Sequence, residues 1–359
     1  MKIALVSDWF APRRGGIESH LIGLGRALTA AGAQVAAITP QPGARSDAFP
    51  VRQLQVARLP GLDLAVSPRL LRAFGTALDE IRPDVVHIHA SIVAPACVAG
   101  LMAARRAGLP IVLTAHSDLA AIAPLLALAG RAAGKRLSGV VMTGVSARIA
   151  GQLAALAPGA VPVVLPNGFD AGFWMADSVP EAPAQAFRLV SAMRLERKKR
   201  PEALSVLRDT VARGLERPVD LIVAGDGPRR ARLGPGVTAP GWLDRAALRE
   251  LFRGAHAFVL PSRHESFGIA ALEARAAGLP VIGRADTGLA EFIRDGEDGF
   301  LCDSDAGMAE AALRLARDPA LWLRMAGPRA ALGRFDWPEV AASHADIYAR
   351  AQAARAGDS

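Results

Sequence analysis

Short apolar segments rich in β-branched residues alternate with amphipathic segments along most of the chain. The apolar segments predict strands at 3–7, 35–39, 85–89, 111–115, 140–143 and 161–165, then at 187–192, 219–224, 256–260, 280–282 and 299–302. Between them, the spacing of apolar residues predicts helices over 17–31, 68–81 and 93–107. Gly32 and Gly108 follow two of these helices, where a left-handed residue closes the last turn. Strands without alternation, separated by helices, predict parallel sheets covered on both faces.

The alternation pauses at residues 166–186, a segment rich in Pro, Gly and small polar residues. A chain of 359 residues is long enough for two domains of roughly 100–200 residues, each with its own core. We therefore expect an N-terminal domain, a linker, a second domain and a final helix, with bounds at 1–170, 171–186, 187–336 and 337–359. The sequence does not decide whether the final helix packs on the second domain or returns to the first.

Two segments suggest a membrane or secreted protein, but neither meets the requirements. The opening MKIALVSDWFAPRRGG has an apolar run too short for a signal peptide, and Asp8 follows at once. Residues 85–104 carry no Asp, Glu, Lys or Arg, but they contain two histidines and Pro95. A buried strand running into a helix is therefore favoured over a membrane span. Cys97 and Cys302 stand far apart without a CxxC, which argues against a disulfide scaffold and indicates a reducing, cytoplasmic compartment.

The basic charge is concentrated in the first half of the chain. Of the net charge of +8, residues 1–175 contribute +7, from 16 Lys and Arg against 9 Asp and Glu. A basic excess attracts nucleic acid, acidic lipid headgroups or phosphorylated ligands without choosing among them. A well-solvated surface in an arginine-rich protein explains it equally well, because only four lysines accompany 38 arginines.

Several common motifs are absent or incomplete. The sequence has no GxxxxGK[ST] phosphate loop and no GxSxG nucleophile elbow. The AGDGP segment at 224–228 lacks the third glycine of a dinucleotide fingerprint, so a nicotinamide-binding function is poorly supported. His87 and His89 place two imidazoles on one face of a strand. No acidic or cysteine partner lies nearby in sequence, so a structural or site-wall role is favoured over a metal pair.

The segment 261–273, PSRHESFGIAALE, is the strongest candidate for a ligand site. A strand ends before it, its loop holds Glu265, and a helix is expected to begin near Phe267. Free amides and the dipole at a helix start favour a phosphate, and Gly268 allows close approach of the backbone. Glu273 lies two turns further along, where its carboxylate can accept hydrogen bonds from sugar hydroxyls. An ordinary capped helix with solvent-facing acids is the alternative.

A cationic cluster follows the predicted strand 187–192. It contains Arg194 and the run RKKR at 197–200, which includes Lys199. In open α/β sheets, ligands bind beyond the carboxyl ends of the strands. The cluster is therefore well placed to neutralise a diphosphate leaving group, although a solvated basic turn is the simpler alternative.

Two further candidates follow strands of the first domain. The paired glycines of RRGGIE at 13–18, which include Gly16, allow backbone amides to approach an anion at a helix start. A flexible turn is the alternative. In TAHSD at 114–118, His116 can donate a hydrogen bond to a sugar oxygen, or it is a core histidine.

With these motifs in order, the chain resembles a family 4 glycosyltransferase of the GT-B superfamily, whose members are retaining and use nucleotide sugars. The resemblance spans nearly the whole chain. It is carried by six ordered matches: GGIESH (15–20), PNGFD (166–170), MRLERKKRPE (193–202), AGDGP (224–228), the E-x7-E pair of Glu265 and Glu273, and GLAEFIRDGEDGFL (288–301). It implies two Rossmann-like, doubly wound parallel-sheet domains facing a central cleft.

The resemblance also implies roles for individual residues. In the second domain, Arg194 and Lys199 hold the diphosphate, Glu265 grips the sugar and phosphate, and Glu273 binds the ribose. The amides that grip the same group belong to Phe267, Gly268 and Ile269.

In the first domain, Gly16 lines the donor phosphate and acceptor region, and His116 contacts the transferred sugar. The chain departs from the family at two positions. Arg200 stands where the family often has Gly, and the usual His-Asp neighbours are separated here by a serine, which puts the inherited role of Asp118 in doubt.

The function implied is transfer of a hexosyl group from a nucleotide-diphosphate sugar to a hydroxyl acceptor, with retention and without a cofactor or metal. A glycan or lipid-linked acceptor of cell-envelope or polysaccharide synthesis is expected, and nucleic acid is not an expected partner. The alternatives are another GT-B enzyme, such as a sugar-nucleotide epimerase or phosphorylase, and a non-catalytic nucleotide-sugar-binding protein.

A place at the inner face of the membrane depends on one segment of the basic first half. LAAIAPLLALAG at 119–130 is followed by Arg131, Lys135 and Arg136. An apolar helix with such a basic end suits an anionic membrane surface. An internal core helix fits the same residues and is favoured, so peripheral association of a cytoplasmic enzyme stays a hypothesis.

Overall fold

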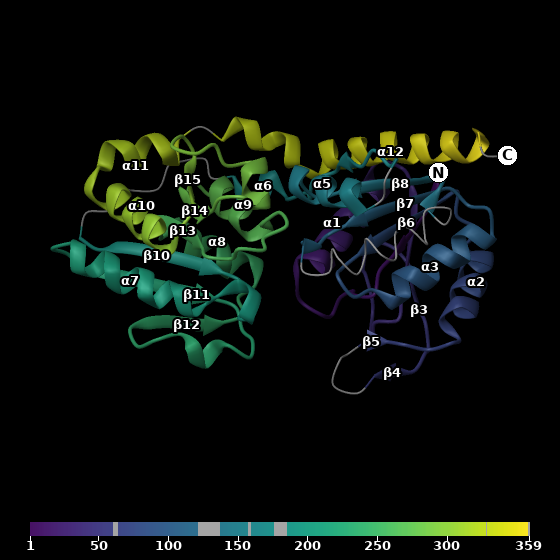
Figure 1. Cartoon of the computed structure of the whole chain (residues 1–359), viewed down its shortest axis with the longest axis horizontal. Helices are drawn as coiled ribbons and strands as arrows, with labels where there is room; N and C mark the ends of the chain where they lie inside the picture. The colour runs from purple at the N-terminus through teal and green to yellow at the C-terminus, as the bar shows by residue number, and fades with distance from the viewer. Residues whose placement is uncertain (60–63, 121–136, 157–158, 176–184, 328, 358–359) are drawn as a thin grey trace. The chain divides into compact units, whose positions relative to one another are not determined.

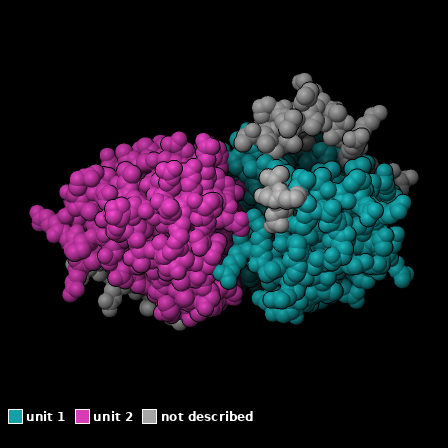
Figure 2. Space-filling model, turned by 90° about the horizontal axis from the view of Figure 1, so that it is seen from below, with its two compact units in different colours: residues 1–168, 335–359 teal, residues 169–334 magenta. Residues whose placement is uncertain are grey.

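The computed structural model describes residues 1–59, 64–120, 137–156, 159–175, 185–327 and 329–357. The chain forms two compact units, shown in different colours in Figure 2. Unit 1 combines Met1–Gly168 with Phe335–Ser359, and unit 2 is Phe169–Arg334. The proposed membrane-surface helix at 119–130 and its basic end lie almost entirely outside the described residues, as do residues 176–184 of the expected linker.

Unit 1 contains a seven-stranded parallel sheet in the order β3-β2-β1-β6-β7-β8-β9. Its strands are β1 (Lys2–Val6), β2 (Gln34–Thr39), β3 (Val51–Gln53), β6 (Val85–Ala90), β7 (Ile111–Ala115), β8 (Val140–Gly144) and β9 (Val163–Val164). The described helices of the unit are α1 (Gly16–Ala30), α2 (Leu70–Ile81), α3 (Pro95–Arg106), α5 (Ala147–Leu156) and α12 (Trp337–Gly357). A short antiparallel pair, β4 (Arg58–Leu59) and β5 (Leu64–Ala65), lies outside this sheet.

The two faces of this sheet have separate cores because neighbouring residues of β1 point in opposite directions. Ala4 and Val6 pack with apolar residues of α2 and α3. Ile3 and Leu5 pack with apolar residues of α1 and α12. Helix α12 therefore completes unit 1 although it comes from the far end of the chain (Figure 1).

Two glycines hold the start of α12 against unit 1. A Cβ at Gly23 would lie 2.0 Å from the Trp337 ring, and a Cβ at Gly168 would lie 2.4 Å from it. The indole can pack this closely only because both positions lack a side chain.

Unit 2 contains a six-stranded parallel sheet in the order β12-β11-β10-β13-β14-β15. Its strands are β10 (Phe187–Ala192), β11 (Val219–Ala224), β12 (Val237–Gly241), β13 (Ala257–Leu260), β14 (Val281–Arg284) and β15 (Gly299–Cys302). Its described α-helices are α6 (Ala171–Trp174), α7 (Glu202–Gly214), α8 (Arg245–Arg253), α9 (Ile269–Ala276), α10 (Asp305–Arg317) and α11 (Pro319–Ala326). The strand order reverses between β10 and β13, and such a switch point is where open α/β sheets bind ligands.

The predicted α/β alternation is confirmed in both units. The uncharged region 85–104 forms strand β6 and most of helix α3, as the sequence predicts. Among the described residues, no helix has the length and apolar content needed to cross a membrane. The sequence pattern missed β3, β12 and the β4–β5 pair, and the strand expected at 161–165 contains only the two paired residues of β9.

Candidate active site

The switch point of unit 2 brings together two predicted site residues that are far apart in sequence. Lys199 ends a 3-10 turn after β10, and Glu265 lies in the loop after β13. Lys199 Nζ donates a hydrogen bond to Glu265 Oε2 over 2.5 Å. Glu265 is a buried residue, 8% exposed. The paired charges thus lie at the carboxyl ends of the central strands, where an anionic ligand is expected.

The same loop leads into helix α9, which offers backbone N–H groups to a ligand. Gly268 precedes the helix with φ +96°, a left-handed conformation that favours glycine. Among the described residues, no side chain caps this helix start. The first-turn amides of α9, beginning with Ile269, therefore combine with the helix dipole to favour an anion. Phe267, two residues before α9, is buried, 1% exposed.

Glu273 lies on α9 in a partly buried position. Desolvation raises its pKa to about 8, although the nearby positive charge of Arg245 opposes this shift. The carboxyl group therefore keeps a proton at neutral pH and can donate a hydrogen bond as well as accept one. A sugar hydroxyl can satisfy both functions, whereas the sequence suggested only an accepting carboxylate.

The raised pKa of Glu273 predicts a pH-dependent loss of stability. The folded chain binds this proton more tightly than the unfolded chain, in which the pKa is near the usual 4.5. Stability therefore falls as pH rises from about 5 to about 8. We expect Glu273→Gln to remove part of this fall, measured as the thermal unfolding midpoint across that range. Glu310→Gln, on an exposed position of α10, is the control and should follow the wild type. Parallel curves for wild type and Glu273→Gln would contradict the prediction.

Two arginines of the cationic cluster have different surroundings. Arg194 is partly buried, and its Nη1 lies 3.3 Å from Glu196 Oε1. Arg200 instead forms a bidentate ion pair with Asp305, with Nη1–Oδ1 and Nη2–Oδ2 distances of 2.9 and 2.5 Å. Arg200 also has φ +55°, which explains why glycine suits this position. The arginine here contributes an ion pair that fastens the turn to the start of α10.

In unit 1, Gly16 and His116 lie on separate elements. Gly16 is the exposed first residue of α1, and no side chain among the described residues caps that helix. His116 directly follows β7, and its backbone N–H donates to the Ala90 carbonyl over 3.0 Å. Burial lowers the pKa of His116 to about 3. Its imidazole is therefore neutral at physiological pH and has one donor and one acceptor.

Asp118 has a structural role in unit 1. Its carboxylate accepts hydrogen bonds from Arg148 Nη2 at 3.2 Å and Gln152 Nε2 at 2.8 Å, which ties the segment after β7 to α5. It also accepts the Ala120 amide over 2.9 Å. These contacts agree with the departure from the family at this point in the sequence.

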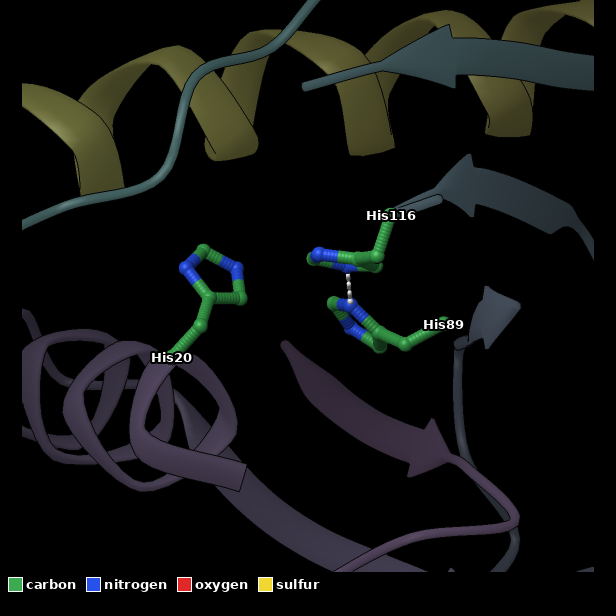
Figure 3. A group of neighbouring side chains, drawn as sticks. All are labelled: His20, His89 and His116. Atoms are coloured by element: carbon green, nitrogen blue, oxygen red, sulfur yellow. Dashed lines mark hydrogen bonds between the residues drawn. The ribbon is translucent and has the colours of Figure 1, made fainter. Parts of the chain in front are cut away.

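Sequence reasoning missed the histidines that surround His116. His20 of α1 and His89 of β6 each bring a ring nitrogen close to it, and all three side chains are buried (Figure 3). The only sequence signal was the His87-x-His89 pair, for which no partner was recognised. The partners come from α1 and from the end of β7.

Comparisons with known proteins identify the family of this chain. The family described as "Glycosyltransferase Family 4" matches residues 14–173, and "Glycosyl transferases group 1" matches residues 186–318. The chain is 32% identical to a glycogen synthase of Mycobacterium tuberculosis, over 98% of this chain and 95% of that one. It is 29% identical to a phosphatidyl-myo-inositol mannosyltransferase of Mycobacterium leprae, over 97% and 96%.

Solved structures show the same fold. Sucrose-phosphate synthase from Thermosynechococcus elongatus superposes with a TM-score of 0.76 at 20% identity, over 98% of this chain and 99% of that one. Anabaena HepE in complex with UDP and glucose also has a TM-score of 0.76 at 20% identity, with 97% and 99% covered. Two parallel-sheet α/β units with these neighbours have the GT-B fold, and the family matches make the protein a GT-B glycosyltransferase. Within that class, the chain belongs to glycosyltransferase family 4, the group 1 glycosyltransferases.

Proposed function

We propose that this glycosyltransferase moves a hexosyl group from a nucleotide-diphosphate sugar to a hydroxyl acceptor, with retention of anomeric configuration. The observation that carries the proposal is the Lys199–Glu265 pair beside the uncapped start of α9. This arrangement offers cationic and N–H donors for a diphosphate and a carboxylate for sugar hydroxyls. The complex of HepE with UDP and glucose supports a donor of this class.

In this mechanism the protein stabilises charge that develops on the leaving group. As the bond between the anomeric carbon and the phosphate oxygen breaks, its electron pair stays on the diphosphate. Lys199, Arg194 and the first amides of α9 stabilise that charge. The acceptor oxygen bonds to the anomeric carbon on the face that the diphosphate leaves, and the departing phosphate takes the acceptor proton. Such same-face attack retains configuration without a covalent enzyme nucleophile.

Glu265 and Glu273 take separate parts of the donor in this proposal. When the diphosphate attracts Lys199, the Glu265 carboxylate becomes available to a hydroxyl of the transferred sugar. Glu273, with its raised pKa, holds the ribose hydroxyls. His116 and Gly16 act from unit 1, on the transferred sugar and on the phosphate and acceptor region respectively.

We further propose an acceptor of cell-envelope glycan or glycolipid synthesis, used on the cytoplasmic side of the membrane. Relatives named as a glycogen synthase, D-inositol 3-phosphate glycosyltransferases and a phosphatidyl-myo-inositol mannosyltransferase support acceptors that are glycans, inositol phosphates or lipids. The basic first half of the chain, +7 over residues 1–175, favours anionic acceptors and membrane surfaces.

Donor activation is proposed to need no divalent ion, because Lys199 and Arg194 supply positive charge at the diphosphate. Full transferase activity is therefore expected in excess chelator, measured as sugar transfer with and without EDTA. A loss of activity that added Mg²⁺ restores would contradict this part of the proposal. A matched incubation with the calcium-saturated chelator controls for effects of the chelator itself.

The test of the proposed function is a thermal-shift panel of UDP, GDP and ADP sugars, followed by transfer assays with the donor that binds. One nucleotide class should raise the unfolding midpoint, and Lys199→Ala should weaken that shift. A chain that binds none of the donors would overturn the proposal. Binding without turnover for glycan or lipid-linked acceptors would indicate a binding protein, and turnover dependent on inorganic phosphate would indicate a phosphorylase.

A further inference from the structure

A cluster of histidines lies on one face of the unit 1 sheet. It gathers side chains from α1, β6, the segment after β7, and α12, namely His20, His87, His89, His116 and His344. Each of these side chains is at most 8% exposed. Figure 3 shows three of the rings, His20, His89 and His116, directed toward one another. One nitrogen from each of these three rings lies within 4.8 Å of the others.

Two of the five histidines have hydrogen bonds that explain their burial. His87 bonds Tyr348 Oη over 2.9 Å through Nδ1 and Thr114 Oγ1 over 2.7 Å through Nε2. His344 Nδ1 lies 2.7 Å from the carbonyl of Val340, one turn earlier in its own helix. These rings serve the packing of α12 on the sheet.

The three remaining rings are less completely paired. His89 Nδ1 lies 2.9 Å from His116 Nε2. Among the described residues, His20 Nδ1 and His89 Nε2 are buried and have no hydrogen-bond partner. A buried polar nitrogen without a partner costs about 1–3 kcal/mol, so two of them in one cluster call for an explanation.

Protonation does not supply that explanation. Burial lowers the pKa of His20 and His89 well below the usual range, and neighbouring histidines lower it further. Burial lowers the pKa of His116 to about 3. The three rings are therefore neutral at physiological pH, each with one lone pair, although one of the two rings joined by the His89–His116 hydrogen bond uses its lone pair to accept that bond. Neutral imidazole is the form that binds metal ions.

We propose that His20, His89 and His116 form a binding site for a divalent transition-metal ion of the zinc type. Three imidazoles without a thiolate suit Zn²⁺ or Co²⁺. A tetrahedral ion with metal–nitrogen bonds of about 2.0–2.1 Å holds its nitrogens roughly 3.3 Å apart. The three nitrogens lie within 4.8 Å of one another, so binding would draw the rings closer together. The ion would replace the His89–His116 hydrogen bond and leave a fourth position open.

The metal site would be inhibitory and would take no part in sugar transfer. This inhibition rests on the proposed function, in which His116 contacts the transferred sugar. A metal bound to His116 removes its lone pair and crowds the place of that sugar. Added Zn²⁺ should then inhibit transfer reversibly, and a chelator should restore it. Metal binding is measured without any transfer reaction. A failure of the metal site can therefore be distinguished from a failure of the proposed transferase function.

The experiment is a titration of the full chain, with any affinity tag removed, by Co²⁺ in the absence of nucleotide. Visible d–d absorption of tetrahedral intensity should saturate at one Co²⁺ per chain. His20→Gln and His89→Gln should weaken binding by about tenfold or more, while folding is checked by circular dichroism. His264→Gln removes an exposed histidine outside the cluster and should leave the titration unchanged.

A further variant keeps the test decisive if removal of a histidine disturbs folding. His20→Cys retains a ligand and should add a near-ultraviolet thiolate-to-cobalt charge-transfer band. The proposal is overturned if the wild type shows no tetrahedral cobalt spectrum, or if the spectrum survives His20→Gln and His89→Gln. It is also overturned if His264→Gln abolishes the spectrum, or if His20→Cys binds cobalt without the new band.

Discussion

Replacing Lys199 by Ala is expected to lower kcat by roughly 10²–10³, with a smaller rise in KM for the donor. This size is typical when one preorganised group that stabilises transition-state charge is removed. Because charge on the diphosphate grows as the glycosidic bond breaks, Lys199 contributes more to the transition state than to donor binding. Steady-state kinetics at varied donor concentration, at saturating acceptor, separates the two constants.

The neighbouring lysine provides a matched control. Lys198 lies in the same 3-10 turn, but its side chain is 57% exposed and its Nζ lies 3.6 Å from Glu196 Oε2. Lys198→Ala should leave kcat within about twofold of the wild type, as expected of a weak surface ion pair. Equal kcat for Lys199→Ala and the wild type would refute the assigned role. Equal losses in both variants would indicate only a general effect of positive charge.

The sequence predicts the buried strands of this fold well and the edge strands poorly. Central strands such as β10 and β11 are continuous apolar segments, and their predicted bounds agree with the structure. The missed strands β3 and β12 lie at the edges of their sheets. Their residues are only partly buried, and β12 contains Pro240, which is tolerated at an edge because one side lacks ladder partners. Their pairing depends on the neighbouring strand rather than on their own pattern.

Proximity of Lys199 and Glu265 was predictable, whereas the histidine cluster was not. The two charged residues follow predicted parallel strands, and the carboxyl ends of such strands share one edge. The convergence of His20 with His89 depends on the rotation of α1 about its axis. The approach of His89 to His116 depends on the register of β6 and β7, in which His89 lies opposite Thr114. Neither feature is encoded in local spacing.

The protonation of Glu273 shows the same limit in electrostatic terms. A glutamate on a predicted amphipathic helix is ordinarily ionised. Here desolvation reverses that state, with a pKa raised to about 8. Desolvation arises from neighbouring elements of unit 2 packed around α9, so it becomes visible only when the tertiary contacts are known.

Replacing Gly288 by Ala is expected to destabilise unit 2 and to distort the donor loop. A Cβ at Gly288 would lie 2.0 Å from the Ser266 carbonyl oxygen and 2.6 Å from Phe267 Cα. These are backbone atoms of the segment that leads into α9, so they can yield only if that segment moves. Gly288 N–H also donates to the Glu265 carbonyl over 2.8 Å. Overpacking of this kind costs about 1–3 kcal/mol, and displacement of the Glu265 loop should raise KM for the donor.

Gly333→Ala is the control for this prediction, because no heavy atom lies within 4 Å of a Cβ at that position of unit 2. Urea unfolding of the full chain should give a clearly lower midpoint for Gly288→Ala and an unchanged one for Gly333→Ala. Donor titration of the same proteins should show weaker binding for Gly288→Ala alone. Equal midpoints and equal donor affinities would mean that the loop accommodates the methyl group, and that the close packing of Gly288 on Ser266 does not hold the donor site in shape.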